Sequence, residues 1–269
     1  MSRDFLTHRY TRFHIVKRKS GQRGARILAK PPNTSQLPRL AAVDLQPVNL
    51  YLIATMAGYP SLRHEIVTVG QRLADCGLIA GTDGNISVKC PDGRILVTPT
   101  GMNKGRLGPE DLVVVDSEGR QVEGNRAATS ELPMHLFAYA CRNDVMAVVH
   151  AHPPHATAFA VAGVELPVDI LPEVVVFVGD IPLAPYAPPG TEAVPRALEP
   201  FIADHDAILM RNHGLLTFGR TLEEAYNRHE TVEHFALILW LATRLGTPGR
   251  IPPDDLSRLK ELRRGGRRA

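Results

Sequence analysis

The spacing of apolar residues divides the chain into helices and strands from about residue 61 onward. Leu62, Ile66, Val69 and Leu73 recur every three or four positions, which predicts an amphipathic helix that ends near Gly77. The same periodicity predicts further helices at about 131–141, 153–162, 221–245 and 254–263. In the long helix we expect six apolar residues to face inward: Leu222, Ala225, Val232, Phe235, Leu239 and Leu241.

Short β-branched or alternating runs predict strands between these helices. They lie at about 86–89, 95–98, 112–116, 145–149, 174–178, 207–211 and 217–219. The turn Pro91-Asp92-Gly93-Arg94 joins the first two strands as an antiparallel hairpin. Helices and strands in this order predict an α/β fold: a three-layer α/β/α arrangement around a central, mainly antiparallel sheet.

Two of the predicted strands lead directly into histidines. His150-Ala151-His152 follows the run 145–149, and because strand side chains repeat every second residue, both imidazoles leave on the same face. His213 follows the run 207–210. If these strands are neighbours and end at one edge of the sheet, the three imidazoles meet there.

Three neutral imidazoles with one open position suit a catalytic divalent metal. A closed structural site would be expected to add a fourth ligand, often Cys, and no Cys lies near these histidines in the sequence. The alternative is that each histidine is a surface residue or a satisfied core residue, which is the usual role of an isolated histidine at a strand end. The His-x-His pattern alone does not decide between the two.

Three further segments offer groups that bind phosphate. Glycines in Gly81-Thr82-Asp83-Gly84-Asn85 let backbone N–H groups approach an anion. Thr98-Pro99-Thr100-Gly101 adds a hydroxyl and a flexible N–H at the end of a strand. In Thr129-Ser130-Glu131-Leu132-Pro133, we expect Ser130 to cap a helix N-terminus, which favours an anion. Each segment alone is a turn or a cap, but together they predict a phosphate pocket.

Glu131 suits either of two roles. An acidic side chain in the first turn of a helix complements the helix dipole, an effect of roughly 0.3–1 kcal/mol. Beside a metal, the opposite charge would instead keep the carboxylate ionised. A substrate that displaced it from the metal would then free it to act as a general base.

The composition is that of an ordinary globular protein, with 44% hydrophobic and 22% charged residues among 269. No apolar run reaches the roughly 18–20 residues of a membrane span, and the basic N-terminus lacks the continuous apolar segment of a secretory signal. Cys76, Cys90 and Cys141 show no disulfide-framework spacing. We therefore expect a cytoplasmic protein without a membrane partner.

The net charge of +3 is unevenly distributed. Residues 1–50 and 258–269 together hold 16 basic and 3 acidic residues, whereas 51–257 hold 15 basic and 25 acidic ones. An acidic body argues against a nucleic-acid partner. We expect residues 1–50 to form a basic, disordered extension without a role, the alternative being an arm that touches RNA or a membrane. Residues 251–269 should form a C-terminal helix and a basic tail.

In this order, the segments resemble those of the class II aldolase/adducin family. The matching segments are 81–87, 98–101, 129–131, 150–152, 184–186 and 212–214, which lie within about residues 61–245. The resemblance implies a catalytic domain over residues 51–250 that binds Zn²⁺, or another divalent cation such as Mn²⁺, through His150, His152 and His213. It makes Glu131 both a ligand of the resting metal and the catalytic acid/base. It implies that the phosphate is held by Gly84, Asn85, Thr100, Gly101, Thr129 and Ser130.

The activity implied by this resemblance is aldol cleavage. A short-chain ketose 1-phosphate, similar to fuculose phosphate, would give dihydroxyacetone phosphate and an aldehyde. The metal would polarise the carbonyl and stabilise the enediolate, while Glu131 moved the proton at the nucleophilic carbon. No Schiff-base lysine is required, and we expect Lys89 and Lys104 to be ordinary surface residues. The family also implies a homotetramer with sites at subunit interfaces.

One position departs from the family pattern. Sugar-phosphate aldolases carry a tyrosine after the histidine strand, which reaches a neighbouring subunit's site as the second acid. Leu171 stands there in this chain, and Asp169 or Glu173 could substitute. Decarboxylation, dehydration or epimerisation on the same fold therefore remain alternatives. A non-catalytic adducin-like interaction protein is a further alternative, although adducins lack the complete metal set.

Overall fold

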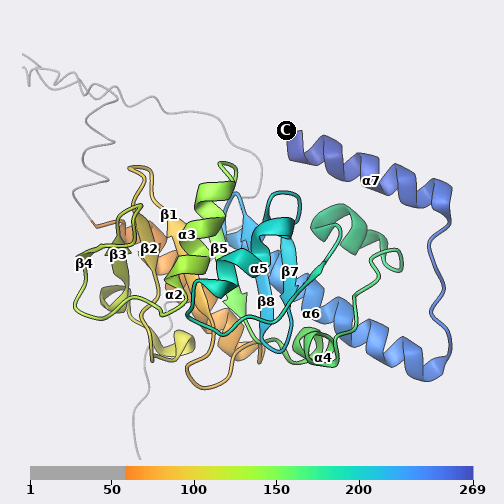
Figure 1. The fold of residues 1–269 in the computed structure, drawn as a ribbon, viewed down its shortest axis with the longest axis horizontal. Coiled ribbons are helices and arrows are strands. Elements are labelled where there is room, and N and C mark those ends of the chain that lie inside the picture. The colour runs from red at the N-terminus through yellow and green to blue at the C-terminus, as the bar shows by residue number, and fades with distance from the viewer. Residues whose placement is uncertain (1–57, 269) are drawn as a thin grey trace, which may run out of the picture. The chain divides into compact units, whose positions relative to one another are not determined.

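The computed structural model describes residues 58–268 of the chain (Figure 1). The expected basic extension, residues 1–50, lies outside the described residues. Among the described residues, five α-helices precede the last one: α2 (Pro60–Asp75), α3 (Leu132–Cys141), α4 (Pro154–Ala162), α5 (Ala193–Ile202) and α6 (Leu222–Leu245). The last is α7 (Pro253–Arg268). No helix in this described part is both long enough and apolar enough to cross a membrane.

The strands of the described residues form one eight-stranded sheet in the order β4-β3-β2-β1-β5-β8-β7-β6. They are β1 (Asn85–Lys89), β2 (Ile95–Val97), β3 (Val113–Val115), β4 (Gln121–Glu123), β5 (Ala147–Ala151), β6 (Leu183–Ala184), β7 (Ala207–Met210) and β8 (Gly214–Gly219). Every neighbouring pair is antiparallel except β6 and β7, which are parallel. The predicted α/β fold with a mainly antiparallel sheet is confirmed.

Helices cover both faces of this sheet (Figure 1). Val148 of β5 packs in a core cluster with residues of α3 and α5. Its neighbours Ala147 and Val149 point to the opposite face, where they pack with α2 and the start of α6. Farther along that second face, α4 and α6 cover β7 and β8. Alternate side chains of β5 are therefore buried on both sides, which gives the three layers that the apolar pattern predicts.

The segment 174–178 is not the strand that its β-branched residues predict. Residues Val174–Val178 form a single π-helical turn, η3, with Val174, Val175 and Val178 buried against the core. The place beside β7 is taken by β6, only two residues long. Local β-propensity was overridden by packing, as is common for short β-branched runs. A second expectation was also wrong: Leu241 on α6 is 48% exposed rather than inward-facing.

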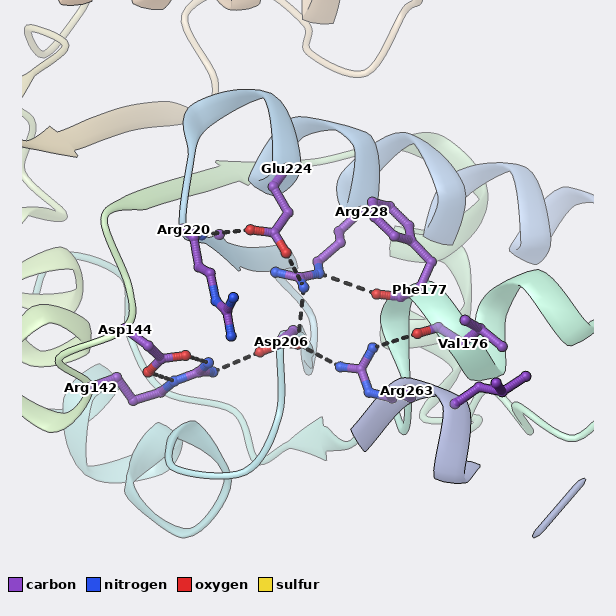
Figure 2. A pocket seen from close by; sticks show the side chains of 11 residues that line it. Arg142, Asp144, Val176, Phe177, Asp206, Arg220, Glu224, Arg228 and Arg263 are labelled. Atoms are coloured by element: carbon purple, nitrogen blue, oxygen red, sulfur yellow. Dashed lines mark hydrogen bonds and ion pairs between the residues drawn. The ribbon is translucent and has the colours of Figure 1, made fainter. Parts of the chain in front are cut away.

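A buried ionic cluster attaches α7 to the sheet (Figure 2). Asp206, at the start of β7, is 1% exposed and lies 2.9 Å from Arg142 and 3.3 Å from Arg228. Arg263 of α7 donates to the same carboxylate at 2.5 Å and to the carbonyl of Val176 at 3.2 Å. A buried carboxylate needs such charge-assisted partners. The cluster lines a cavity of about 250 Å³ at the sheet edge where β5 and β7 begin and β8 ends.

Candidate metal centre

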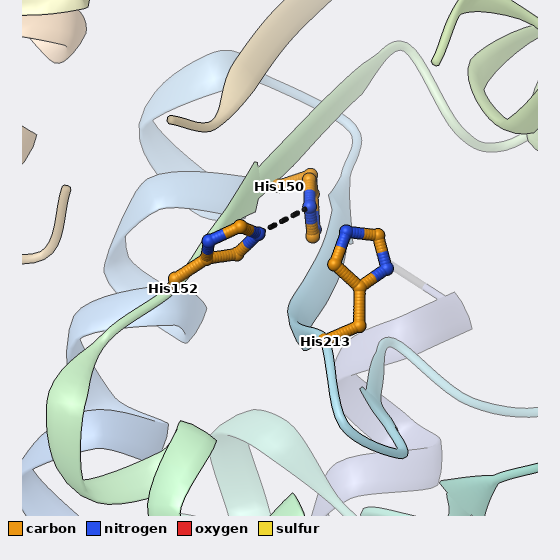
Figure 3. Close-up of side chains that lie close together, drawn as sticks. All are labelled: His150, His152 and His213. Atoms are coloured by element: carbon orange, nitrogen blue, oxygen red, sulfur yellow. Dashed lines mark hydrogen bonds between the residues drawn. The ribbon is translucent and has the colours of Figure 1, made fainter. Parts of the chain in front are cut away.

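Three imidazoles meet at the opposite edge of the sheet (Figure 3). His150 lies near the end of β5, His152 follows that strand, and His213 lies in the turn between β7 and β8. Their ring centroids are 4.6–5.1 Å apart, and one nitrogen from each lies within 4.8 Å of the others. The two strands are not neighbours, as the sequence pattern had suggested, because β8 lies between β5 and β7. Both strands nevertheless end at the same edge, so residues about sixty positions apart in the sequence meet there.

Two backbone features allow this close approach. Asn212 adopts a left-handed conformation, φ 54°, which turns the chain between β7 and β8 and is tolerated by Asn better than by most residues. Gly214 follows the third histidine, and a Cβ atom there would lie 2.5 Å from both the carbonyl oxygen of Ala151 and Cδ2 of His152. Only glycine lets β8 begin against the histidine pair.

Burial favours the neutral form of His150 and His213. Desolvation lowers the pKa of His150 well below its usual value, and the neighbouring His213 and His152 lower it further. Desolvation also lowers the pKa of His213, against the opposing effect of Glu131. A neutral imidazole offers a nitrogen lone pair, which is the form that ligates a metal.

Hydrogen bonds join two of these imidazoles to one another and to the backbone (Figure 3). His150 donates from Nδ1 to the carbonyl of Leu215 at 2.9 Å, so its lone pair is on Nε2. Nδ1 of His152 faces the carboxylate of Asp83 at 3.4 Å, and its Nε2 lies 3.2 Å from Nε2 of His150. A cation bound here would take the lone pair on Nε2 of His150 and would also serve the buried Oε1 of Glu131, which has no hydrogen-bond partner. The residues present therefore fit a divalent metal ion.

A carboxylate completes this donor set. Glu131 Oε2 lies 3.3 Å from Nε2 of His150, and Oε1 lies 3.3 Å from Nε2 of His213. Oε2 accepts a hydrogen bond from Asn85, whereas the buried Oε1 has no hydrogen-bond partner. Glu131 is itself the N-cap of α3, so the expected cap at Ser130 was wrong by one residue. Its side chain turns away from the helix N–H groups toward the histidines and makes no capping hydrogen bond.

The three segments expected to bind phosphate lie together beside this centre. The carbonyl of Thr98 accepts a hydrogen bond from the N–H of Thr129 at 3.2 Å. The hydroxyl of Thr98 accepts one from the N–H of Ile86 at 3.1 Å. A Cβ at Gly84 would lie 2.8 Å from the carbonyl of His150. Thr100, Gly101 and Ser130 are exposed, whereas Gly84, Asn85 and Thr129 are buried. The structure thus brings all six residues to one edge, and their binding of phosphate stays a prediction.

Two residues of this region were missed or misjudged from the sequence. Lys104, expected at the surface, is 3% exposed and donates from Nζ to the carbonyl of Thr82 at 2.6 Å. Burial lowers its pKa, while Asp83 and Glu131 raise it. His135, to which the sequence pattern assigns no role, is fully buried beside Asn85. Its place four residues after Glu131, on the same helix face, was the available signal.

The segment that departs from the family pattern is packed into the fold. Leu171 is half-buried against the core under α4 and α6. Asp169 pairs with Arg250 at 2.5 Å, and Glu173 is exposed just before η3. Asp169 is therefore engaged in an ion pair within the described chain.

Comparison with known proteins agrees with this geometry. Residues 64–240 match the family described as Class II Aldolase and Adducin N-terminal domain. The 5-deoxy-D-ribulose 1-phosphate aldolase of Bacillus thuringiensis serovar kurstaki is 35% identical over 199 residues, 73% of this chain and 92% of that protein. The 3-oxo-tetronate 4-phosphate decarboxylase of Escherichia coli K12 is 34% identical over 185 residues, 67% of this chain and 87% of that protein.

Solved structures agree as well. An L-fuculose 1-phosphate aldolase is 32% identical and superposes with a TM-score of 0.70, covering 75% of this chain and 95% of its own. The family resemblance of the sequence motifs is thereby confirmed, and this chain belongs to the class II aldolase and adducin family.

Proposed function

We propose that this protein is a metal-dependent aldolase that cleaves a short-chain ketose 1-phosphate into dihydroxyacetone phosphate and an aldehyde. The observation that carries the proposal is the complete donor set: three convergent imidazoles and a carboxylate 3.3 Å from two of them. A non-catalytic, adducin-like protein would have no need to keep four such groups together. The aldolase names of similar proteins support the same reaction class.

His150, His152, His213 and, in the resting site, Glu131 would hold the cation, Zn²⁺ or another divalent ion such as Mn²⁺. When bound, it polarises the substrate carbonyl and stabilises the negative charge that develops on that oxygen. The side chains of Thr100 and Ser130, which are exposed residues, and the backbone of the glycine loops would hold the phosphate.

Glu131 would carry the proton at the reacting carbon. In the condensation direction, its carboxylate removes a proton from the hydroxyl-bearing carbon of dihydroxyacetone phosphate, which then bonds to the aldehyde carbon. The aldehyde oxygen takes a proton from solvent water and becomes the C4 hydroxyl. Cleavage is the reverse: the C4 hydroxyl gives its proton to solvent, the C3–C4 bond breaks with its electron pair on C3, and Glu131 returns a proton to C3.

The substrate that we propose first is a 5-deoxypentulose 1-phosphate. Leu171 replaces the phenol that the family pattern supplies to sugar-phosphate aldolases, so a substrate of the fuculose type is less favoured. Two similar proteins are named as aldolases of 5-deoxyribulose 1-phosphate. Decarboxylation of a phosphorylated sugar acid is the second candidate, because the protein named 3-oxo-tetronate 4-phosphate decarboxylase is 34% identical to this chain over 87% of its own length.

A substrate panel tests the proposal. Protein purified with its metal would be incubated with 5-deoxyribulose 1-phosphate, fuculose 1-phosphate and 3-oxotetronate 4-phosphate, with coupled detection of dihydroxyacetone phosphate and of carbon dioxide. We expect dihydroxyacetone phosphate from a ketose phosphate and about one divalent ion per chain. Carbon dioxide from the sugar acid alone would replace the aldolase by the decarboxylase. Absence of bound metal after reconstitution would favour the interaction protein.

We also propose that the protein is a cytoplasmic homotetramer with sites at its subunit interfaces, without nucleic-acid or membrane partners. Apolar side chains near the end of α6 support self-association: Trp240 is 44% exposed and Leu245 is 91% exposed. Light scattering coupled to gel filtration should give about four times the 29.5 kDa of one chain. A monomeric mass would contradict the tetramer.

A further inference from the structure

A chain of four hydrogen bonds runs from Glu131 into the core. Asn85 Nδ2 donates to Glu131 Oε2 at 2.8 Å, and Asn85 Oδ1 lies 2.5 Å from Nε2 of His135. Nδ1 of His135 lies 2.7 Å from the hydroxyl of Ser87. That hydroxyl in turn lies 2.7 Å from the hydroxyl of Tyr139.

The chain is built from the periodicity of one strand and one helix. Asn85 and Ser87 are alternate residues of β1 and share a face of the sheet. Glu131, His135 and Tyr139 are spaced by four, so they lie along one face of α3 and its N-cap. The four residues behind the glutamate are 0–6% exposed, so little competing water reaches them.

Chemistry sets the direction of every bond in this chain. A carboxylate can only accept, so the amide nitrogen of Asn85 faces Glu131 and its oxygen faces His135. His135 must therefore donate from Nε2. Burial lowers its pKa to about 3, so the ring is neutral and Nδ1 accepts from Ser87. Ser87 then accepts from Tyr139. All four donors point toward the glutamate.

This arrangement distinguishes the two carboxylate oxygens of Glu131. Oε2 is held by the amide at the end of the chain. Oε1 is buried, has no hydrogen bond and lies 3.3 Å from His213. We propose that Asn85, His135, Ser87 and Tyr139 form a positioning relay that holds Oε2 and leaves Oε1 to exchange the substrate proton. This inference rests on the proposed function, and it makes His135 a positioning residue.

A second buried histidine supplies a matched control. His229 is also fully buried, and burial likewise lowers its pKa to about 3. Its Nδ1 lies 3.3 Å from the hydroxyl of Thr217, and its Nε2 has no hydrogen-bond partner, so no chain leads from it to Glu131. A purely structural role of buried histidine would make the two positions equivalent.

The first experiment compares His135→Leu, His135→Gln and His229→Leu in full-length, metal-loaded protein. We expect His135→Leu to lower kcat by about ten- to a hundredfold with KM unchanged, because Glu131 is no longer held in place. His135→Gln keeps an N–H for Asn85 and should recover most of that loss. His229→Leu should keep the wild-type kcat. Equal kcat for the two leucine variants, or no recovery in the glutamine variant, would overturn the relay.

The second experiment measures the relay without turnover. In protein labelled with ¹⁵N-histidine, the resonances absent from His135→Leu identify the residue. We expect the Nε2–H tautomer of His135 from pH 5.5 to 8.5. A protonated ring or the Nδ1–H tautomer in this range would overturn the relay. A wild-type protein that turns over no ketose phosphate would instead refute the proposed function, and the tautomer would still decide the relay.

Discussion

Gly214 controls the distance between β8 and the histidine pair, so its replacement by alanine should damage the metal centre directly. A Cβ at this position would lie 2.5 Å from the carbonyl oxygen of Ala151 and 2.5 Å from Cδ2 of His152. Ordinary contacts of a Cβ are 3.4–4 Å. One of the two neighbours must therefore move by about 1 Å. Because Ala151 is paired with Leu215 in the sheet, the imidazole of His152 is the group free to shift.

The magnitude follows from the tolerance of metal sites. Ligand distances vary by only about ±0.2 Å, so a displacement of about 1 Å removes a ligand from its position. We expect the Gly214→Ala variant to bind Zn²⁺ at least about tenfold more weakly. The added methyl group should also lower the free energy of unfolding of the metal-free protein by about 1–3 kcal/mol.

Both quantities can be measured against a matched glycine. Zn²⁺ affinity would be obtained by competition with a chromophoric chelator, and stability by urea unfolding of metal-free protein. Gly249→Ala is the control, since a Cβ there would meet nothing within 4 Å. If Gly214→Ala binds Zn²⁺ as tightly as Gly249→Ala and unfolds at the same urea concentration, the steric argument is wrong.

Three further predictions concern the histidines, Glu131 and Asp206. His152→Ala should lose the bound metal in elemental analysis, whereas Glu131→Gln should keep most of the metal and the fold but lose turnover by at least about a hundredfold; wild-type rates in the Gln variant would remove Glu131 from the mechanism. The folded-state pKa of His229, about 3, lies below its unfolded value of 6.5, so stability present above pH 6.5 should be lost as the pH falls toward 3. At pH 5 this group should lower the free energy of unfolding by about 2 kcal/mol. In the His229→Leu variant, the free energies of unfolding measured with urea at pH 7.5 and pH 5 should therefore differ by about that much less than in the wild type. An unchanged difference would contradict the lowered pKa of His229. Asp206→Asn should destabilise the protein by about 3–5 kcal/mol, because it leaves three guanidinium groups without their shared carboxylate; an unchanged thermal midpoint would show that the cluster does not stabilise the fold.

Local patterns in the sequence predict most of the fold. The apolar period of 3.6 or 2 located α2, α6 and the hairpin of β1 and β2, because these elements bury one stripe or one face. The same reasoning failed at η3 and missed β6. The segment that pairs with β7 is selected by long-range contacts in the folded chain, and a stretch of five residues in the sequence does not contain that information.

The meeting of the three histidines was predictable for a different reason. The His-x-His spacing is local, and the third histidine follows a strand that ends at the same edge of the sheet, although β8 lies between that strand and β5. The residues behind Glu131 were not predictable in this way. His135 looks like one histidine in an apolar helix, and its partners Asn85 and Ser87 lie about fifty residues away on β1. Only the packing of α3 against the sheet makes these polar groups meet.

The strands that carry the histidines also separate two sites. The candidate metal centre lies at one edge of the sheet, and the ionic cluster around Asp206, which attaches α7, lies at the other. His150 and His213 lie at one edge of the sheet, whereas Arg142 precedes β5 and Asp206 precedes β7 at the other. With a rise of about 3.3 Å per residue, the two groups are about 15–20 Å apart. Sites at such distances, without shared partners, contribute to stability nearly independently. A variant of Asp206 should therefore lower stability without changing metal affinity, and the energetic effects of Asp206→Asn and Gly214→Ala should add. A marked departure from additivity would mean that the sheet transmits strain between its two edges, and the positions of the histidines would then depend on the docking of α7.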